Sequence, residues 1–120
     1  DIAFGGDSFV VVSAKDLGFS VSRDEARQLS ETGQMIVQAA QEQYGFQHVT
    51  LEEMKEITFC LFALPLEVDD QGRKVTRHAV AIKPGKIDRS PTGTGVSARL
   101  ALMHHRKEVI KATRANKITI

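Results

Sequence analysis

A loop that runs directly into a helix constrains this 120-residue chain more than any other feature. Residues 88–95 read Asp-Arg-Ser-Pro-Thr-Gly-Thr-Gly, and the helix-forming run Val-Ser-Ala-Arg-Leu-Ala-Leu follows at once. One proline and two glycines predict an irregular loop, and a carboxylate and three hydroxyls gather where it meets the helix. Since the first amides of a helix lack acceptors within the helix, they bind anions such as carboxylate or phosphate. The segment predicts an anion cradle, although most junctions of this shape bind nothing.

Two common phosphate-binding loops do not fit this segment. A P-loop would require Gly-Lys-Ser or Gly-Lys-Thr, which is absent from the sequence. Residues 93–98 match the dinucleotide fingerprint only loosely, and no acidic residue follows roughly twenty positions later. Nucleotide binding is therefore disfavoured.

Composition limits the class of protein. With 16 basic and 15 acidic residues, the chain offers no general nucleic-acid surface. Its basic cluster is expected to be a solvated helix face and tail: Arg106, Lys107, Lys111, Arg114 and Lys117. No apolar run approaches the ~20 residues of a membrane span, and no signal peptide begins the chain. A single cysteine excludes an internal disulfide, so a reducing cytoplasm is the expected location.

Apolar, β-prone runs predict five strands. They fall at residues 2–4, 9–14, 57–64, 77–82 and 117–120. Gly5 and Gly6 separate the first two and predict a bulge or a close backbone approach to a ligand. The sequence at 69–72 predicts a hairpin turn in preference to a calcium loop, and Pro84 and Gly85 predict the turn before the 88–95 loop.

Capping signals predict the helices. Ser22 and Glu25 form a capping box, and Gly45 stands at a natural C-terminal cap. The expected apolar face of this helix comprises Ala26, Leu29, Ile36, Val37, Ala40 and Tyr44, with Gly33 a mild weakness. Thr50 and Glu53 suggest a short second helix. The helix over 95–111 is apolar on successive residues, which predicts a largely enclosed helix. The whole pattern predicts an α+β fold in which sheet wraps around a central helix.

The string at 88–95 resembles the second signature of the proline racemase family, where it normally reads Asp-Arg-Ser-Pro-Cys-Gly-Thr-Gly. Residues 1–9 resemble a second family segment: an apolar strand, Gly-Gly, then Asn or Asp. The sequence departs from the racemase pattern at Thr92, where racemases and 4-hydroxyproline epimerases carry a catalytic Cys. A threonine there resembles the trans-3-hydroxy-L-proline dehydratase branch.

The resemblance implies an architecture and a set of roles. Residues 1–120 would form one α+β lobe of a diaminopimelate-epimerase-like fold, a fragment of a two-lobed enzyme of about 330–350 residues. Asp88 would bind the ring nitrogen of a hydroxyproline-type imino acid, and Gly93 and Thr94 would bind its carboxylate. The catalytic base would lie upstream, in a segment resembling Cys-Gly-His-Gly or its Ser variant. No cofactor is implied, and a homodimer stays an open expectation.

A purely structural role is an alternative for several residues of the loop. Asp88 would also suit an Asx-type turn, Ser90 a loop-stabilising hydroxyl, and Arg89 a surface or second-lobe ion pair. Cys60 sits in an apolar strand and is expected to be a buried, inert thiol. His104 and His105 are adjacent on a helix and point about 100° apart, so they do not share a metal, and no metal site is expected.

The threonine decides between reactions. A racemase needs an acid and a base on opposite faces of the α-carbon, and a thiol that titrates near pH ~8.5 can act as either. A threonine hydroxyl is far too weakly acidic, and no loop neighbour is expected to activate it. A β-elimination needs one base, and Thr92 would position the leaving hydroxyl. The prediction is dehydration of trans-3-hydroxy-L-proline to Δ1-pyrroline-2-carboxylate. Alternatives are 4-hydroxyproline epimerase or proline racemase activity, and a non-catalytic amino-acid-binding or interaction fragment.

Overall fold

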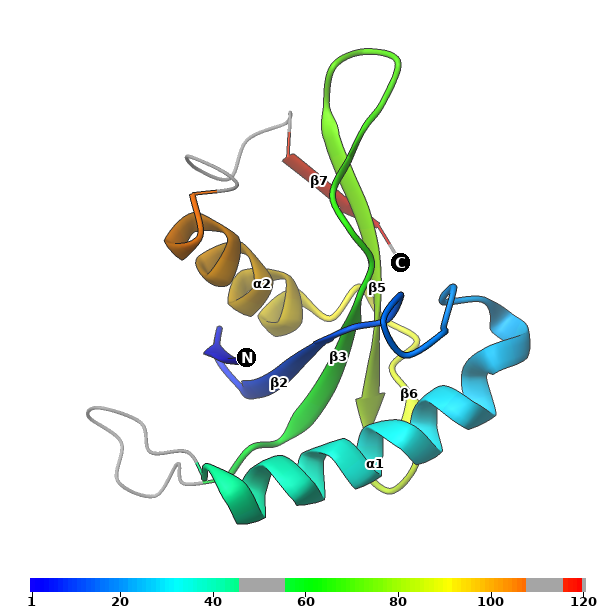
Figure 1. Ribbon diagram of the computed structural model, residues 1–120, viewed down its shortest axis with the longest axis vertical. Coiled ribbons are helices and arrows are strands. Elements are labelled where there is room, and N and C mark those ends of the chain that lie inside the picture. The colour runs from blue at the N-terminus through cyan, green and yellow to red at the C-terminus, as the bar shows by residue number, and fades with distance from the viewer. Residues whose placement is uncertain (46–55, 108–115, 120) are drawn as a thin grey trace.

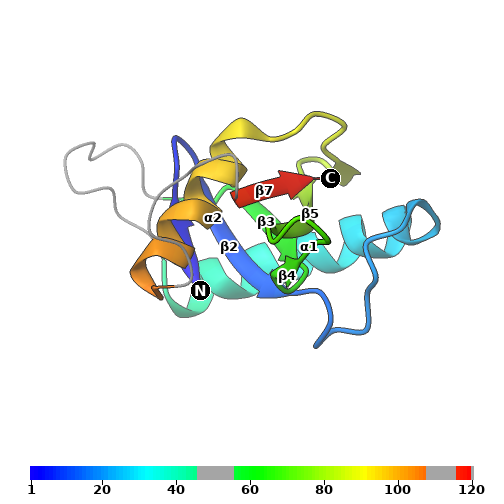
Figure 2. The same ribbon diagram turned by 90° about the horizontal axis from the view of Figure 1, so that it is seen from above.

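A curved mixed sheet carries one helix on each side (Figures 1 and 2). The computed structural model describes residues 1–45, 56–107 and the backbone of 116–119. Its strands are β1 (Ile2–Phe4), β2 (Ser8–Ser13), β3 (Phe59–Ala63), β4 (Glu67–Val68), β5 (Lys74–Ile82), β6 (Lys86–Ile87) and β7 (Asn116–Thr119). Its helices are α1 (Ala26–Gln43), preceded by the 3₁₀ turn η1 (Arg23–Glu25), and α2 (Gly93–His105).

The strand order is β1-β2-β3-β5-β4, and β5 also pairs with β6 and β7. β2 and β3 run parallel with Phe9 opposite Phe59, and the crossover between them contains α1, as a parallel pair requires. β3 and β5 run antiparallel with Cys60 opposite Ala81. β5 therefore has more partners than any other described strand, and it leads directly into the turn before the 88–95 loop.

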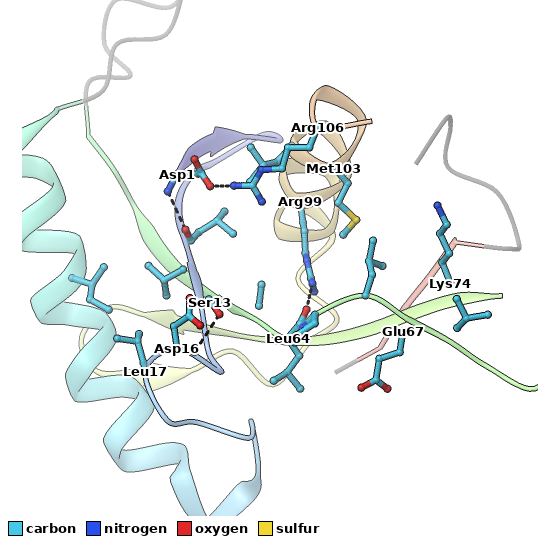
Figure 3. Close-up of a pocket in the computed structure, with 18 residues that line it drawn as sticks. Asp1, Ser13, Asp16, Leu17, Leu64, Glu67, Lys74, Arg99, Met103 and Arg106 are labelled. Atoms are coloured by element: carbon cyan, nitrogen blue, oxygen red, sulfur yellow. Dashed lines mark hydrogen bonds and ion pairs between the residues drawn. The ribbon is translucent and has the colours of Figure 1, made fainter. Parts of the chain in front are cut away.

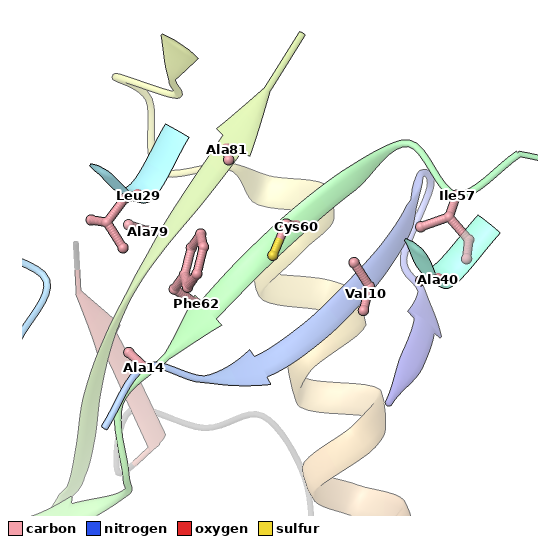
Figure 4. Close-up of a cluster of buried hydrophobic side chains, with 9 residues drawn as sticks. All are labelled: Val10, Ala14, Leu29, Ala40, Ile57, Cys60, Phe62, Ala79 and Ala81. Carbon is pink, nitrogen blue, oxygen red and sulfur yellow. The ribbon is translucent and has the colours of Figure 1, made fainter. Parts of the chain in front are cut away.

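Alternating side chains of the sheet form two separate cores. Cys60, Phe62 and Ala81 point toward α1, within a cluster completed by Val10, Ala14, Leu29, Ala40, Ile57 and Ala79 (Figure 4). Phe9, Val11, Leu61, Val80 and Ala98 form the other cluster, against α2. This half-barrel of sheet around α2 confirms the predicted α+β class.

α1 buries most of the face predicted for it, but neither of its two ends. The capping box of Ser22 and Glu25 is present, and Gly45, with φ of 66°, follows the helix as expected. Yet Ala26 is exposed and Tyr44 is 77% exposed, so both are wrong as core residues. The helix packs through the predicted Leu29, Ile36, Val37 and Ala40, and also through Ser30 and Gly33, which were not predicted. A Cβ at Gly33 would overlap the Cβ of Ala81, so the glycine sets how closely α1 approaches the sheet.

α2 begins at Gly93, two residues earlier than predicted, and buries one face only. Its buried stripe is Gly95, Ala98, Arg99 and Met103, while Ala101 is exposed. The prediction of a largely enclosed helix is wrong. The apolar residues are continuous in sequence, but successive residues point in different directions around the helix, and only one stripe of them is buried. The predicted short helix at Thr50 and Glu53, and residues 108–111, lie outside the described residues. Among the described helices, none is long and apolar enough to cross a membrane.

Candidate active site

The 88–95 loop is attached to the C-terminal end of β5. After the turn at Gly85, β6 runs back along β5 with Ile87 opposite Ala81. The amide of Asp88 then donates to the carbonyl of Val80 at 2.8 Å. From Asp88 the loop leads into α2, which begins at Gly93. The loop is therefore held against the sheet at one end and continues as a helix at the other.

The Asp88 carboxylate organises the loop. Its Oδ1 accepts the amide of Ser90 at 2.9 Å, and its Oδ2 accepts the hydroxyls of Ser90 at 2.9 Å and Thr92 at 2.5 Å. Ser90 in turn accepts the amide of Thr92 at 3.1 Å. The Asx-type turn and the loop-stabilising role of Ser90 are thus confirmed. A carboxylate has about four acceptor positions, so Asp88 can still bind a further donor.

Asp88 is an anion under ordinary conditions. Burial alone would raise the pKa of this half-buried carboxyl, but the hydrogen bonds from Thr92 and from the amide and hydroxyl of Ser90 outweigh it. The pKa of Asp88 therefore lies below its ordinary value. An ionised carboxylate accepts strong hydrogen bonds from ammonium groups.

Thr92 precedes α2 in an unusual conformation. Its φ of 50° and ψ of 70° lie in the left-handed region, which β-branched residues rarely adopt. The side chain is only 7% exposed, and its hydroxyl donates to Asp88 instead of capping the helix. The contact with Asp88 was not expected from the sequence. In the described part of the chain, the first amides of α2, at Gly93 and Thr94, therefore meet no protein acceptor.

The first residue of α2 lies open at the surface. Gly93 is exposed, and a Cβ placed on it would meet nothing within 4 Å. The helix N-terminus carries partial positive charge, so the arrangement suits an anion. The hydroxyl of Thr94 donates to Asp7 at 3.2 Å, which places a carboxylate from the β1–β2 turn beside the same helix end.

The Gly5–Gly6 turn approaches the helix closely. A Cβ on Gly5 would overlap the backbone nitrogen of Ala98 and the carbonyl oxygen of Thr94. Gly6, with φ of 115°, lies against the Thr94 side chain. The close backbone approach expected here is therefore made to α2, and it brings the two family-like segments together.

Two buried polar residues behind the loop were missed by sequence reasoning. His78 is completely buried on β5, and Arg99 of α2 is 5% exposed. Arg99 donates to the carbonyls of Leu64 and Arg77 and to the hydroxyl of Thr76. The only signal was the strand period, since Thr76, His78 and Val80 alternate toward the same face.

A large cavity lies at the C-terminal end of α2. It has a volume of about 1050 Å³ and includes Asp1, Met103 and Arg106 in its lining, but none of the loop residues (Figure 3). Arg106 forms an ion pair with Asp1 there, and Arg99 reaches Leu64. The candidate site is therefore an open surface at the N-terminal end of α2, separate from this cavity.

The remaining reactive side chains do not join the site. Cys60 is fully buried, and burial raises the pKa of its thiol to about 12, which confirms the predicted inert thiol. His104 and His105 are exposed near the end of α2. Among the described residues, no group of three His, Cys, Asp or Glu side chains is arranged to hold a metal ion.

A family model described as proline racemase matches residues 1–118. The chain belongs to the proline racemase family. Two solved structures resemble it, each with a TM-score of 0.79. A hydroxyproline epimerase from Agrobacterium vitis, with bound trans-4-hydroxy-L-proline, is 30% identical over 91% of this chain and 30% of its own. A probable proline racemase from Agrobacterium radiobacter K84, with bound carbonate, is 26% identical over 91% and 31%. The chain thus spans about a third of either neighbour.

Membership in this family agrees with the α+β fold and with the pairing of the two quoted segments. It supports an enzyme of the epimerase, racemase or dehydratase type. Because this chain covers only about a third of each neighbour, the activity and the substrate of the whole protein are proposals.

Proposed function

We propose that the full-length protein containing this chain dehydrates trans-3-hydroxy-L-proline to Δ1-pyrroline-2-carboxylate without a cofactor. One observation carries the proposal. Thr92 stands where the racemase signature has its cysteine, and its hydroxyl donates to Asp88 at 2.5 Å. A hydroxyl oriented in this way is suited to hold a substrate group and unsuited to exchange a proton with carbon.

The surrounding groups suit an imino acid. Asp88 is ionised and its Oδ1 accepts only the Ser90 amide in the described chain, so it retains capacity for the ring ammonium. The open amides of Gly93 and Thr94 suit the carboxylate, because donors fixed before the reaction stabilise the charge that moves onto it. The two groups belong to one loop–helix junction, as a compact five-membered ring requires.

The proposed reaction is a β-elimination. A base removes the α-hydrogen as a proton, and the electron pair of that C–H bond forms a double bond between C2 and C3. The C3–O bond breaks, and the departing hydroxide takes up, directly or through water, the proton that the base removed from the α-carbon, and leaves as water. The resulting enamine tautomerises to Δ1-pyrroline-2-carboxylate. The base is assigned to the part of the protein beyond this chain, in the family-like Cys-Gly-His-Gly segment or its Ser variant.

Thr92 is proposed to act at C3. With its proton directed to Asp88, the Thr92 oxygen has lone pairs to accept the hydrogen of the 3-hydroxyl group. That contact would fix the leaving group relative to the C–H bond that breaks. Racemisation needs a second proton donor and acceptor on the opposite face, and an alcohol titrates far outside the range that suits this role.

The deciding assay uses the full-length protein and three substrates: trans-3-hydroxy-L-proline, trans-4-hydroxy-L-proline and L-proline. Loss of water and exchange of the α-hydrogen with deuterium oxide are followed in parallel. The expected result is water loss from the 3-hydroxy compound alone. Retention of the α-hydrogen in all three compounds would refute the proposed dehydration and also any racemase or epimerase activity on them.

Substitutions at position 92 test the role of the hydroxyl. Thr92→Ser keeps the hydroxyl and is the matched control, expected to retain dehydration within about tenfold. Thr92→Ala is expected to lose it by ~10²-fold or more, as removal of a positioned polar group does. Thr92→Cys is expected to gain racemase or epimerase activity as dehydration falls. Dehydration unchanged in Thr92→Ala would remove Thr92 from the mechanism.

A second candidate is 4-hydroxyproline epimerase or proline racemase activity. The names of the two solved neighbours favour it. α-Hydrogen exchange with inversion at C2, and without water loss, would support this candidate over dehydration. A non-catalytic amino-acid-binding protein is the alternative from another class, and binding without any exchange would identify it.

A further inference from the structure

His78 occupies an unusual position beneath the candidate site. It lies on β5 between Thr76 and Val80, which face α2, and its side chain is fully buried. Within the described chain, neither ring nitrogen has a hydrogen-bond partner. Buried polar atoms are nearly always paired, so an unpaired imidazole indicates a role beyond filling space.

The loop passes directly over this ring. β6 runs antiparallel to β5, and the Asp88 amide bonds to the Val80 carbonyl at 2.8 Å. A backbone contact from the Pro91 carbonyl raises the pKa of the ring, although that contact falls short of a hydrogen bond of normal geometry.

The charged groups around the ring keep it neutral. Burial lowers the pKa of His78 to about 4, and the Arg99 guanidinium on α2 acts in the same direction. The Pro91 carbonyl and the Asp88 carboxylate oppose this shift without overcoming it. At neutral pH the ring therefore keeps one N–H donor and one acceptor nitrogen.

The backbone above the ring needs support. Thr92 holds a left-handed conformation that its β-branched side chain disfavours, and such a conformation persists only where its surroundings fix it. On the outer side, Asp88 and Ser90 hold the Thr92 hydroxyl and amide. On the inner side, His78 is the polar side chain that faces the Pro91 carbonyl, immediately before Thr92.

We propose that His78 is a positioning residue: through the Pro91–Thr92 peptide it holds Thr92 and the first amides of α2 in the direction that substrate binding requires. The inference rests on the proposed function, because it concerns the same site. It also distinguishes His78 from an ordinary core residue. Replacing an unpaired buried polar group by an apolar one of similar size preserves stability or improves it. His78 would then be kept for the site and at the expense of stability.

Two variants of the full-length protein separate these roles. His78→Leu removes both nitrogens at similar volume, and His78→Gln restores a side-chain N–H. The control is Cys60→Ala, because Cys60 is also fully buried in the sheet but points toward α1. Each variant is measured by urea unfolding, by kcat and KM for water loss, and by the amide resonances of Gly93 and Thr94 in ¹⁵N-labelled protein.

We expect stability and activity to change independently in these variants. His78→Leu keeps at least the wild-type urea midpoint, loses tenfold or more in kcat and shifts the Gly93 and Thr94 resonances. His78→Gln recovers kcat to within threefold. Cys60→Ala lowers the midpoint without shifting those resonances or kcat.

The proposal is overturned if His78→Leu leaves kcat and both resonances unchanged, or if its loss of kcat simply follows a lower urea midpoint and His78→Gln recovers nothing. If the wild-type protein turns over none of the three imino acids, the proposed function fails. The amide resonances then decide alone whether His78 positions the helix N-terminus.

Discussion

Two glycines of α2, two residues apart, should respond in opposite ways to the same substitution. In a helix, alanine is favoured over glycine by about 0.5–1 kcal/mol, because glycine loses more backbone freedom on folding. A Cβ on Gly93 would meet nothing within 4 Å. Gly93→Ala should therefore raise the free energy of unfolding by about 0.5 kcal/mol, since the first helical position gains less than the interior.

At Gly95 the change in the free energy of unfolding has the opposite sign, because the site is crowded. A Cβ there would lie 2.9 Å from Thr92 Cγ2, 3.3 Å from Phe9 Cε1 and 3.4 Å from Leu61 Cδ1. Phe9 and Leu61 are fully buried and Thr92 is 7% exposed, so none can move freely. Overpacking of this kind costs about 1–3 kcal/mol. After the gain in helix propensity, Gly95→Ala should lower the free energy of unfolding by about 1 kcal/mol.

Function should respond differently from stability. The Gly93 methyl would project into the space in front of the free amides, so Gly93→Ala should weaken binding of trans-3-hydroxy-L-proline while the protein becomes more stable. The Gly95 methyl would displace Thr92 from Asp88. Urea unfolding and isothermal titration of the full-length protein measure the two quantities separately. A Gly95→Ala protein more stable than wild type would refute the close packing of Thr92, and undiminished binding by Gly93→Ala would refute the carboxylate position.

Three further substitutions test the supporting structure. Gly5→Ala should cost about 1–3 kcal/mol, because its Cβ would overlap backbone atoms of α2 that no rotamer change can move; an unchanged urea midpoint would contradict this. Arg99→Met should raise the pKa of His78, measured by NMR titration of the ring, because the guanidinium helps to lower it. Wild type should lose about 3 kcal/mol relative to His78→Leu as pH falls from 6.5 to 4. The unfolded ring takes up its proton over this range, whereas the folded ring, whose pKa is about 4, begins to do so only near the lower end; parallel stability curves would refute this.

Local signals predicted the elements well. The apolar run at 57–64 contains β3, the Asp69 turn closes the β4–β5 hairpin, and the Ser22 capping box precedes α1. Each depends on residues close in sequence. By contrast, the face that α1 buries depends on Gly33 meeting Ala81, which is 48 residues away, so helical periodicity alone chose Tyr44 wrongly.

In the candidate site, too, some features follow from residues close in sequence and others depend on residues far apart. The helix-start amides of Gly93 and Thr94 and the turn at Asp88 follow from the loop string itself, and anion binding by those amides stays a prediction. The contact of the Thr92 hydroxyl with Asp88 needed the loop's three-dimensional path, and the close approach of Gly5 to α2 joins segments about ninety residues apart. His78 gave no sequence signal beyond its place in an alternating strand, because its neighbours are set by the return of β6 along β5.

The geometry at Thr92 bears on the choice of reaction. An α-proton taken from one face of a substrate can be replaced on the other only if a group there has a proton to give. The Thr92 proton is engaged by an ionised Asp88, and the hydrogen bond that orients it also lowers the pKa of Asp88, so the pair offers no ready proton to carbon. The same pair leaves an oxygen with lone pairs facing the site. Under the proposed function, an intermediate formed here would be discharged by expelling a neighbouring hydroxyl in preference to reprotonation with inversion, and a substrate with its hydroxyl at C3 would therefore suit this loop better than proline.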